Sequence, residues 1–441
     1  MDAWHKRTLQ SLLLPSGLIL LLAVLFLQTG IVPVSAAAVD AFYYLVFVIG
    51  MGLAWRFQSS NTLSAIILLL LSHRALEFFS NGKIATGGPG RVSLEVIAVL
   101  LPLNFLALGL VPERRLTIPT TAQRAIVLLF QSAFVAAVCR PGVSKAPAIF
   151  HLALLDKAYF RWTHLPQTAL FIFFITFAAL AARFWMCRKP IDSGLLWATA
   201  AVFAGLQVGG VGRFGSAYFA TAALILAGSI IENSYLLAYH DELTDLQGRR
   251  AFNLALPQLT APYVIAAVDI DHFKSVNDTF GHDTGDQVLR MIASRLARVS
   301  GGGESYRIGG EEFTVLFPGK STKEVITHLE ALRQLIEASS FRLRSMPDRR
   351  SAPRESTDRR AKTADPRKSS KKVTRSISGG DGNLSVTVSI GIAECKSQTQ
   401  KVDQVIEAAD QALYQAKRNG RNRIEIAGSQ RTRTRAKRAT A

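Results

Sequence analysis

Long apolar runs recur through the first half of the chain. Eight of them have about the length needed to cross the roughly 30 Å of hydrocarbon in a bilayer. They cover residues 9–28, 40–56, 62–79, 94–111, 122–139, 166–187, 193–211 and 216–236. No small-residue cleavage pattern follows the first run, so we interpret it as a span and not as a removed signal peptide. The sequence therefore predicts an all-α polytopic membrane bundle of seven or eight helices over residues 1–230.

Basic residues beside these runs indicate an orientation for the bundle. Eight spans place both ends of the domain on one side, which we expect to be the cytoplasm because it collects Lys and Arg. It would hold Lys6, Arg7, Arg114, Arg115, Arg183, Arg188 and Lys189. The rule is only partly obeyed, since the outward loop 140–165 also contains four basic residues. The run at 122–139 is the weakest, which leaves the count at seven or eight.

The last apolar run continues without Pro or Gly through residues 231–241, which predicts a stalk helix that leaves the membrane. Ile231, Tyr235 and Ala238 lie along one face of such a helix. Two interpretations stay open. The stalk either transmits movement from the membrane domain or only links the two halves of the chain.

Shorter periodic segments over residues 242–428 predict an α+β domain with a mixed sheet. Tyr263–Val268 is expected to be a buried strand, and a helix capped by Asp283 or Thr284 carries an apolar stripe as far as Leu296. Two strands are expected to meet at Gly309-Gly310, where we expect glycines with positive φ. The expected elements after the first helix are strands at 305–308 and 313–317, a helix at 322–338, a strand at 384–390 and a helix at 403–418.

The net charge of +19 comes mainly from two segments that look unfolded. Thirteen basic and four acidic residues lie between Arg342 and Arg375, and five more basic residues lie between Arg431 and Arg438. Neither segment has an aromatic residue that could stack on a base, so we predict no nucleic-acid partner. The insertion 343–378 and the tail 429–441 are either solvated and disordered or in contact with anionic lipid headgroups.

Cysteine use excludes two other classes of site. The three cysteines, Cys139, Cys187 and Cys395, have no metal-ligand spacing and form no even set. A disulfide framework or a zinc site is therefore not expected.

Three acidic residues carry the candidate chemistry. Asp269 comes at the end of the buried strand, and Glu311 and Glu312 come directly after the two glycines of the hairpin. Carboxylates brought together in this way favour a hard divalent cation, because Mg²⁺ prefers oxygen ligands and keeps substrate phosphates in its shell. Like charges crowded together without a cation would be costly. The pattern predicts a metal and phosphate site.

Residues 241–426 resemble a GGDEF domain, the catalytic domain of diguanylate cyclases, in a variant that reads Gly-Gly-Glu-Glu-Phe. Six blocks match in the family's order and near its spacing. They are Asp241–Arg250, Asp269–Lys274, Asn277–Asp286, Gly309–Phe313, Thr387–Ala393 and Ala412–Asn422. The resemblance implies a fold related to class III nucleotidyl cyclases and a reaction that joins two GTP into cyclic di-GMP, with release of two pyrophosphates.

The resemblance also implies a role for each matched residue. The metals would be bound by Asp269, the carbonyl of Ile270, Glu311 and Glu312, and Glu311 would also assist deprotonation of the attacking 3′-hydroxyl. The other matched residues would bind the substrate. They are Asn277 and Asp286 at the guanine edge, Leu289 lining its pocket, His282 against the nucleotide, and Phe273, Lys274, Gly309, Gly310, Lys417 and Arg421 at the triphosphate.

The family implies Mg²⁺ as the cofactor, with Mn²⁺ as an alternative, and GTP as the substrate. Each domain holds one GTP, so a homodimer is expected. The location implied is the bacterial inner membrane, crossed several times, with the catalytic domain in the cytoplasm. Two rival functions stay open: a non-catalytic membrane regulator that binds GTP or cyclic di-GMP, and a transporter with a regulatory domain.

The chain departs from the family pattern at two places. Asp245 and Gly248 replace the usual Gly and Asn at the start of the domain, which affects coupling to the stalk more than chemistry. The family's product-inhibition motif is Arg-x-x-Asp, whereas the corresponding positions here are Ser300–Gly303. We therefore expect that this form of feedback is lost.

The membrane half contains one ionisable cluster. His73, Arg74 and Glu77 lie at helical spacing near the end of one span, and Glu95 opens the next. These side chains either pair with one another at the interface or line a pocket for an unknown sensory ligand.

Overall fold

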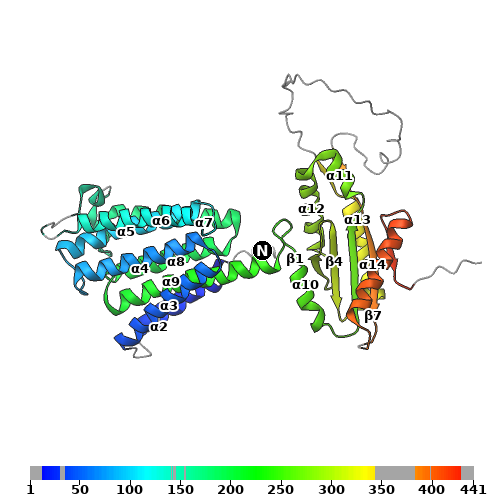
Figure 1. Ribbon diagram of the computed structural model, residues 1–441, viewed down its shortest axis with the longest axis horizontal. Coiled ribbons are helices and arrows are strands. Elements are labelled where there is room, and N and C mark those ends of the chain that lie inside the picture. The colour runs from blue at the N-terminus through cyan, green and yellow to red at the C-terminus, as the bar shows by residue number, and fades with distance from the viewer. Residues whose placement is uncertain are drawn as a thin grey trace, which may run out of the picture. The chain divides into compact units, whose positions relative to one another are not determined.

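The chain folds into two compact units, residues 1–236 and 237–441. The structure is a computed structural model that describes residues 12–29, 35–140, 142, 146–152, 155–342, 383–397 and 399–428 (Figure 1). The basic insertion 343–378 and the tail 429–441 lie outside the described residues. Each unit is described by itself below.

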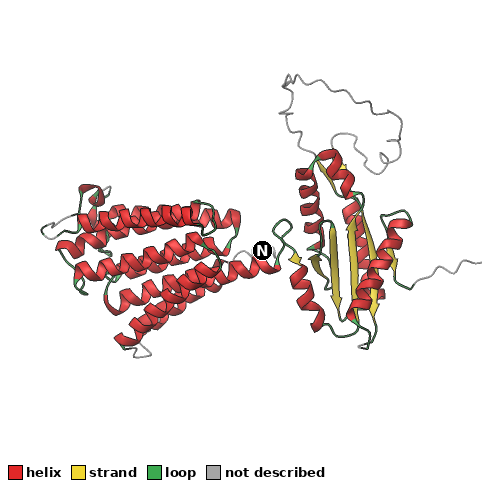
Figure 2. Cartoon of the chain, in the orientation of Figure 1, coloured by secondary structure: helices red, strands yellow, loops and turns green. Residues whose placement is uncertain are grey.

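The N-terminal unit consists of helices (Figure 2). A short π-helical segment, Leu13–Gly17, leads into α2 (Leu18–Thr29). The long helices that follow are α3 (Ala36–Arg56), α4 (Ser60–Ser80), α5 (Gly88–Leu110), α6 (Ile118–Val138), α7 (Gln167–Cys187), α8 (Pro190–Gln207) and α9 (Gly212–Tyr239). A helix therefore coincides with each of the eight apolar runs.

Within the described residues, six of these helices are long and apolar enough to cross a membrane. They are α3, α4, α5, α6, α7 and α9. The run at 122–139, the weakest in the sequence, is among them as α6. The other two runs form the shorter helices α2 and α8, so the total number of spans stays a prediction.

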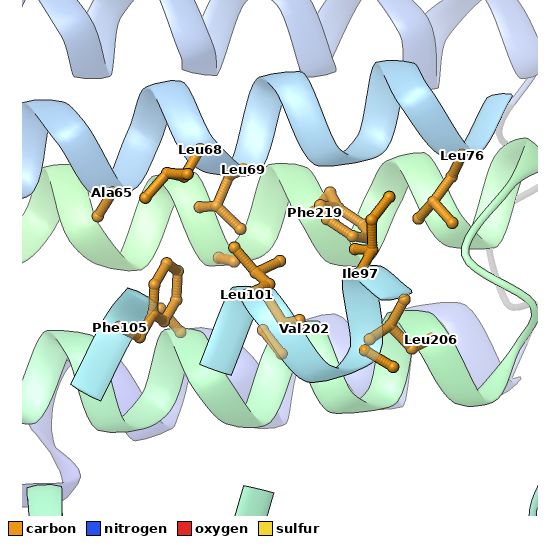
Figure 3. Packing of buried hydrophobic residues seen from close by; sticks show 14 of the residues in the cluster. Ala65, Leu68, Leu69, Leu76, Ile97, Leu101, Phe105, Val202, Leu206 and Phe219 are labelled. Atoms are coloured by element: carbon orange, nitrogen blue, oxygen red, sulfur yellow. The ribbon is translucent and has the colours of Figure 1, made fainter. Parts of the chain in front are cut away.

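The core of this unit lies between α4, α5, α8 and α9. Figure 3 shows Leu68 and Leu69 of α4, Leu101 of α5 and Val202 of α8 turned toward the same space. Phe219 of α9 is fully buried in the same cluster. These helices bury apolar side chains against one another, whereas α6 buries almost none of its surface.

Helix α9 is continuous from the bundle to Tyr239, as the sequence predicts. Its residues are mostly buried as far as Ile230 and exposed or half-buried beyond it. No Pro or Gly interrupts the segment after Gly228, so nothing in the sequence breaks the helix where its surroundings change.

The C-terminal unit is built on a six-stranded mixed sheet with the strand order β1-β3-β4-β2-β7-β8. Its strands are β1 (Gln247–Gly248), β2 (Tyr263–Ile270), β3 (Glu304–Arg307), β4 (Glu312–Pro318), β7 (Val388–Cys395) and β8 (Ile424–Ile426). A separate two-stranded sheet pairs β5 (Ser340–Arg342) with β6 (Asn383–Ser385). The α+β fold with a mixed sheet is therefore confirmed.

Helices cover both faces of the sheet (Figure 2). On one face, Val264, Val268 and Ile270 pack with apolar residues of α12 (His282–Leu296) and α13 (Thr322–Glu337). On the other face, Ile265 and Ala267 pack with residues of α10 (Arg249–Ala255) and α14 (Val402–Arg418). The central strand β2 is buried along its whole length for this reason, and α11 (Phe273–Phe280) follows it.

Three local predictions are wrong. Helix α12 begins at His282 after Gly281 at φ +82°, and the Thr284 hydroxyl donates to the Phe280 carbonyl and does not cap the helix. Gly309 and Gly310 do not have positive φ. The strand expected at 384–390 is divided, because the chain leaves β6 after Ser385 and joins the main sheet at β7.

A tight approach between β7 and α14 generates a stability prediction. A methyl group on Gly391 would overlap the main chain of α14 at Ala409 and Leu413, and main-chain atoms cannot move aside as a side-chain end can. We expect Gly391→Ala to destabilise the C-terminal unit by about 1–3 kcal/mol, the usual range for an overpacked core.

Scanning calorimetry of the full chain would measure this loss. The matched control is Gly248→Ala, since the nearest atom to a methyl group there lies at an ordinary 3.5 Å. If the two variants melt together, the close packing of β7 on α14 is wrong.

Candidate active site

The candidate site lies at the carboxyl end of β2. Asp269 pairs in register with Glu312, the first residue of β4, on one side and with Ser389 of β7 on the other. Asp269 is only 4 % exposed, while Glu312 is exposed. The register therefore places the carboxylate at the end of β2 beside Glu312, the second of the two hairpin glutamates.

Lys417 of α14 provides the nearest positive charge. Its Nζ atom lies 2.9 Å from Oδ2 of Asp269. Burial raises the pKa of Asp269, Lys417 acts against this, and Glu312 and Asp271 add to it. Burial also raises the pKa of Glu311, and the charge of Asp269 raises it further. Lys417 thus balances Asp269, while Glu311 and Glu312 add further negative charge beside it in a partly buried position.

This donor set fits a hard divalent cation in charge and in chemistry, because every donor is an oxygen and the carboxylates repel one another. The side chains are not arranged as a finished cage. No three His, Cys, Asp or Glu side chains of the described ranges lie close enough together to hold a metal. The roles of Asp269, Ile270, Glu311 and Glu312 as ligands therefore stay predictions.

Arg307 holds the turn between β3 and β4. Its Nε and Nη2 atoms donate to the carbonyls of Gly309 at 3.2 Å and Gly310 at 2.7 Å. A methyl group on Gly309 would lie 2.5 Å from the Glu312 carboxylate. A side chain at position 309 would therefore displace the end of the exposed Glu312 side chain, and no positive φ requires glycine there.

The same arginine joins the turn to the start of the domain. Nη1 of Arg307 lies 2.6 Å from Oδ1 of Asp241, which follows the end of α9 closely in sequence. Burial alone would raise the pKa of Asp241, but hydrogen bonds from Thr244 and Arg307 outweigh it and hold the pKa below its usual value. Arg307 was not among the predicted site residues, although it lies two residues before the glycine pair.

The predicted guanine-binding residues lie on α11 and α12. The side-chain oxygen of Asn277 is buried and has no hydrogen-bond partner among the residues that the structure describes. It lies so close to Gly285 that any side chain at that position would displace it. Asp286 is the next residue and is half-buried, and His282 is exposed at the start of α12. An unpaired buried acceptor beside a carboxylate is a ready partner for a donor on a ligand.

Two other predicted substrate residues have buried side chains. Phe273 is 6 % exposed and Leu289 is 4 % exposed, and both belong to the core between the sheet and α12. Phe273 can reach a phosphate only through its main-chain N–H at the start of α11. Lys274 and Arg421 keep exposed or half-exposed side chains.

A cleft of about 360 Å³ lies beside the signature carboxylates. Glu312, Lys417, Asp410 and Arg249 line it together with apolar residues of the sheet. Burial raises the pKa of Asp410, and the charge of Glu312 raises it further. Asp410 is thus a further acid that lines the cleft beside Glu312, and it was not among the predicted site residues.

The ionisable cluster of the N-terminal unit is largely paired within the chain. Glu77 forms an ion pair with Arg74, and Glu95 lies 2.7 Å from Arg91. His73 is fully buried and lies 3.4 Å from the Ser216 hydroxyl of α9. The pairing supports the first of the two interpretations of the cluster, and a sensory ligand stays untested.

Fold and site together define an α+β domain with an acidic centre at the end of its central strand. Residues 238–350 and 351–423 match the family model described as diguanylate cyclase, GGDEF domain. The C-terminal unit is a GGDEF domain.

Curated relatives match over this domain. The diguanylate cyclase DgcP of Pseudomonas aeruginosa is 35% identical over 207 residues, which are 45% of this chain and 25% of DgcP. The response regulator PleD of Caulobacter vibrioides is 31% identical over 202 residues, which are 44% of this chain and 37% of PleD. The chain therefore spans well under half the length of either relative.

Solved structures match over the same region. The crystal structure of the GGDEF domain of DgcB from Caulobacter crescentus in complex with c-di-GMP is 34% identical, with a TM-score of 0.34. The match covers 44% of this chain and 94% of that domain.

The crowded carboxylates generate a prediction on pH. The pKa of Asp269 is raised in the folded state, so its ionisation costs folding free energy as the pH rises through the window above its unfolded pKa. Without divalent ions, Asp269→Asn should therefore melt at a higher temperature than the wild type at pH 7, and this advantage should vanish in acid.

Scanning calorimetry of the full chain in EDTA at several pH values would measure the difference. Glu407→Gln, which neutralises an exposed carboxylate of α14, is the control and should change nothing. A destabilised Asp269→Asn at pH 7 would mean that the Lys417 contact outweighs the burial of the charge.

Proposed function

We propose that the chain is a membrane-anchored diguanylate cyclase. The 3′-hydroxyl of each GTP attacks the α-phosphate of the other, so two P–O bonds form, two pyrophosphates leave and cyclic di-GMP results. The observation that carries the proposal is the in-register pairing of Asp269 with Glu312 beside Lys417, inside the segment that matches the GGDEF family model.

Glu311 has the properties of the proposed proton acceptor. Its pKa is raised by burial and by the neighbouring Asp269, which brings its proton affinity closer to neutral pH. Asp269, Glu311, Glu312 and the Ile270 carbonyl would hold Mg²⁺ or Mn²⁺, which would neutralise charge on the triphosphate and on the attacking oxygen when bound. Lys417 would then be released from Asp269 toward the phosphates.

The nucleotide would lie between α11, α12 and the hairpin. Asn277 would supply an acceptor and Asp286 a carboxylate for the guanine edge. His282 lies nearby in the sequence, and Leu289 would form the apolar wall of the guanine pocket. The N–H groups of Phe273 and Lys274 open α11 and can meet phosphate oxygens. The Gly309-Gly310 turn lets the main chain come close to the same phosphates, and Lys417 and Arg421 add positive charge.

Each domain would hold one GTP, so the reaction needs two domains facing each other. Ile231 and Tyr235 lie one turn apart at the end of α9 and are 54% and 58% exposed. Apolar side chains spaced in this way support pairing with a second copy. Six helices of the described residues are apolar enough to support anchoring in a membrane. The proposal places them in the bacterial inner membrane, with the domain in the cytoplasm and its activity gated by the bundle.

The test of this function is GTP conversion by the full chain in lipid nanodiscs with Mg²⁺. We expect Glu311→Gln to lower kcat by about a hundredfold or more, since removal of a positioned proton acceptor has costs of this size. The product is identified by mass. Glu407→Gln on α14 should keep full activity.

A wild type that binds GTP and forms no cyclic di-GMP would contradict the proposal. That result would support the rival function, a non-catalytic regulator.

The loss of product feedback is a separate prediction. At the position of the family's inhibitory Asp, a side chain on Gly303 would lie 2.7 Å from the buried Phe317 ring and 2.9 Å from Val299. The site thus lacks the motif and also the room for it. With the active site blocked by a non-hydrolysable GTP analogue, isothermal titration should find no saturable binding of cyclic di-GMP.

A tight second site that disappears on substitution of Ser300 or its neighbours would contradict this prediction. Added cyclic di-GMP should also leave the initial rate of GTP conversion unchanged.

A further inference from the structure

Asp271 is a buried acid that has no role in the proposed mechanism. It follows the end of β2, two residues after Asp269, and is 5 % exposed. Its carboxylate accepts hydrogen bonds from the Thr387 hydroxyl at 2.7 Å and the Ser389 hydroxyl at 2.6 Å. A third bond comes from the main-chain N–H of Asn422 at 3.0 Å.

The third donor ties Asp271 to the turn between α14 and β8. Gly420, Arg421 and Asn422 have φ values of +116°, +63° and +47°. The left-handed region costs a non-glycine residue about 1–2 kcal/mol, so two such residues in a row need contacts that hold them there.

Those contacts converge on Asn422. Its side-chain oxygen accepts from Arg333 at 2.6 Å, and its side-chain nitrogen donates to Glu337 at 2.7 Å. Both partners lie on α13, and Arg333 also bonds Glu330 and Glu337. With the Asp271 bond, the residue is held from two elements, so Asn422 is the fixed point of the turn.

Arg421 lies in the sequence between two residues that contact the end of β2 or the residue just after it. Before it in the chain, Lys417 contacts Asp269, and after it Asn422 contacts Asp271. The Arg421 side chain has no hydrogen bond or ion pair with any other described residue. Its direction is therefore set by the main chain of the turn alone.

We propose that Asp271 is a positioning residue that aims Arg421 at the triphosphate of the bound nucleotide. The inference rests on the proposed function, in which Arg421 binds phosphate. Asp271 itself touches neither the nucleotide nor the metal. It fixes the distance between the carboxylate half of the site, on β2, and the basic half, at the end of α14.

The test uses the full chain in nanodiscs and compares the affinity for a non-hydrolysable GTP analogue with the affinity for guanosine. The ratio of the two isolates the contribution of the triphosphate. We expect Asp271→Ala to lower this ratio about tenfold, the size of one lost hydrogen bond to a charged group, and to leave guanosine affinity unchanged. In turnover, KM for GTP should rise more than kcat falls.

Two variants separate positioning from general damage. Asp271→Asn keeps an oxygen that accepts from the Asn422 N–H, and its NH₂ group can donate to the Ser389 hydroxyl. This variant should therefore keep the wild-type ratio that Asp271→Ala loses. Thr387→Val removes a hydrogen bond to the same carboxylate from the residue just before β7 and leaves the turn untouched, so it should also keep the ratio. Asp271→Ser replaces the Ala variant if the latter does not fold, because it is polar and too short to reach Asn422.

A double-mutant cycle with Arg421→Ala gives the decisive comparison. If Asp271 acts through Arg421, Asp271→Ala should change the ratio less than about twofold once Arg421 is gone. Additive losses, or equal losses of GTP and guanosine affinity, would overturn the inference. A wild type that binds the GTP analogue no better than guanosine would instead refute the proposed function, and the inference would fall with it.

Discussion

The site depends on a single electrostatic constraint, which is negative charge at the end of a strand buried on both faces. Helices cover both faces of β2, so the carboxylate of Asp269, near the end of this strand, loses most of its contact with water. Register then places Glu312 beside Asp269, and the hairpin adds Glu311. Burial raises the pKa values of Asp269 and Glu311, and the excess of negative charge raises them further. The same excess accounts for the contact with Lys417 and for the fit to a divalent ion.

The sequence predicts the parts of the domain in which one pattern dominates. β2 is a run of apolar residues, and the stripe from Val288 to Leu296 fixes α12, because burial decides both. The sequence also predicts that Asp269 and the two glutamates share one site. The register that pairs Asp269 of β2 with Glu312 of β4 is not set by the hairpin of β3 and β4 and was not predicted. The eight apolar runs locate the helices of the N-terminal unit for the same reason.

Features that depend on long-range contacts were not predictable. The strand expected at 384–390 breaks because Asp271 bonds both the main chain and the side chain of Thr387, and the sequence does not show that pairing. Gly309 has no positive φ, and the Glu312 carboxylate that a side chain there would displace lies close to it only in the folded hairpin. Arg307, Asp271 and Asn422 act through partners that are distant in sequence, so local periodicity gives no signal for them.

The small sheet of β5 and β6 has a consequence for the sequence between its two strands. Arg342 and Asn383 face each other in register, so the residues on either side of the basic insertion are held together by strand pairing. The conformational entropy of closing the intervening segment then grows only slowly with its length. Changes in the length or charge of the sequence between these two residues should therefore cost the fold of the C-terminal unit little.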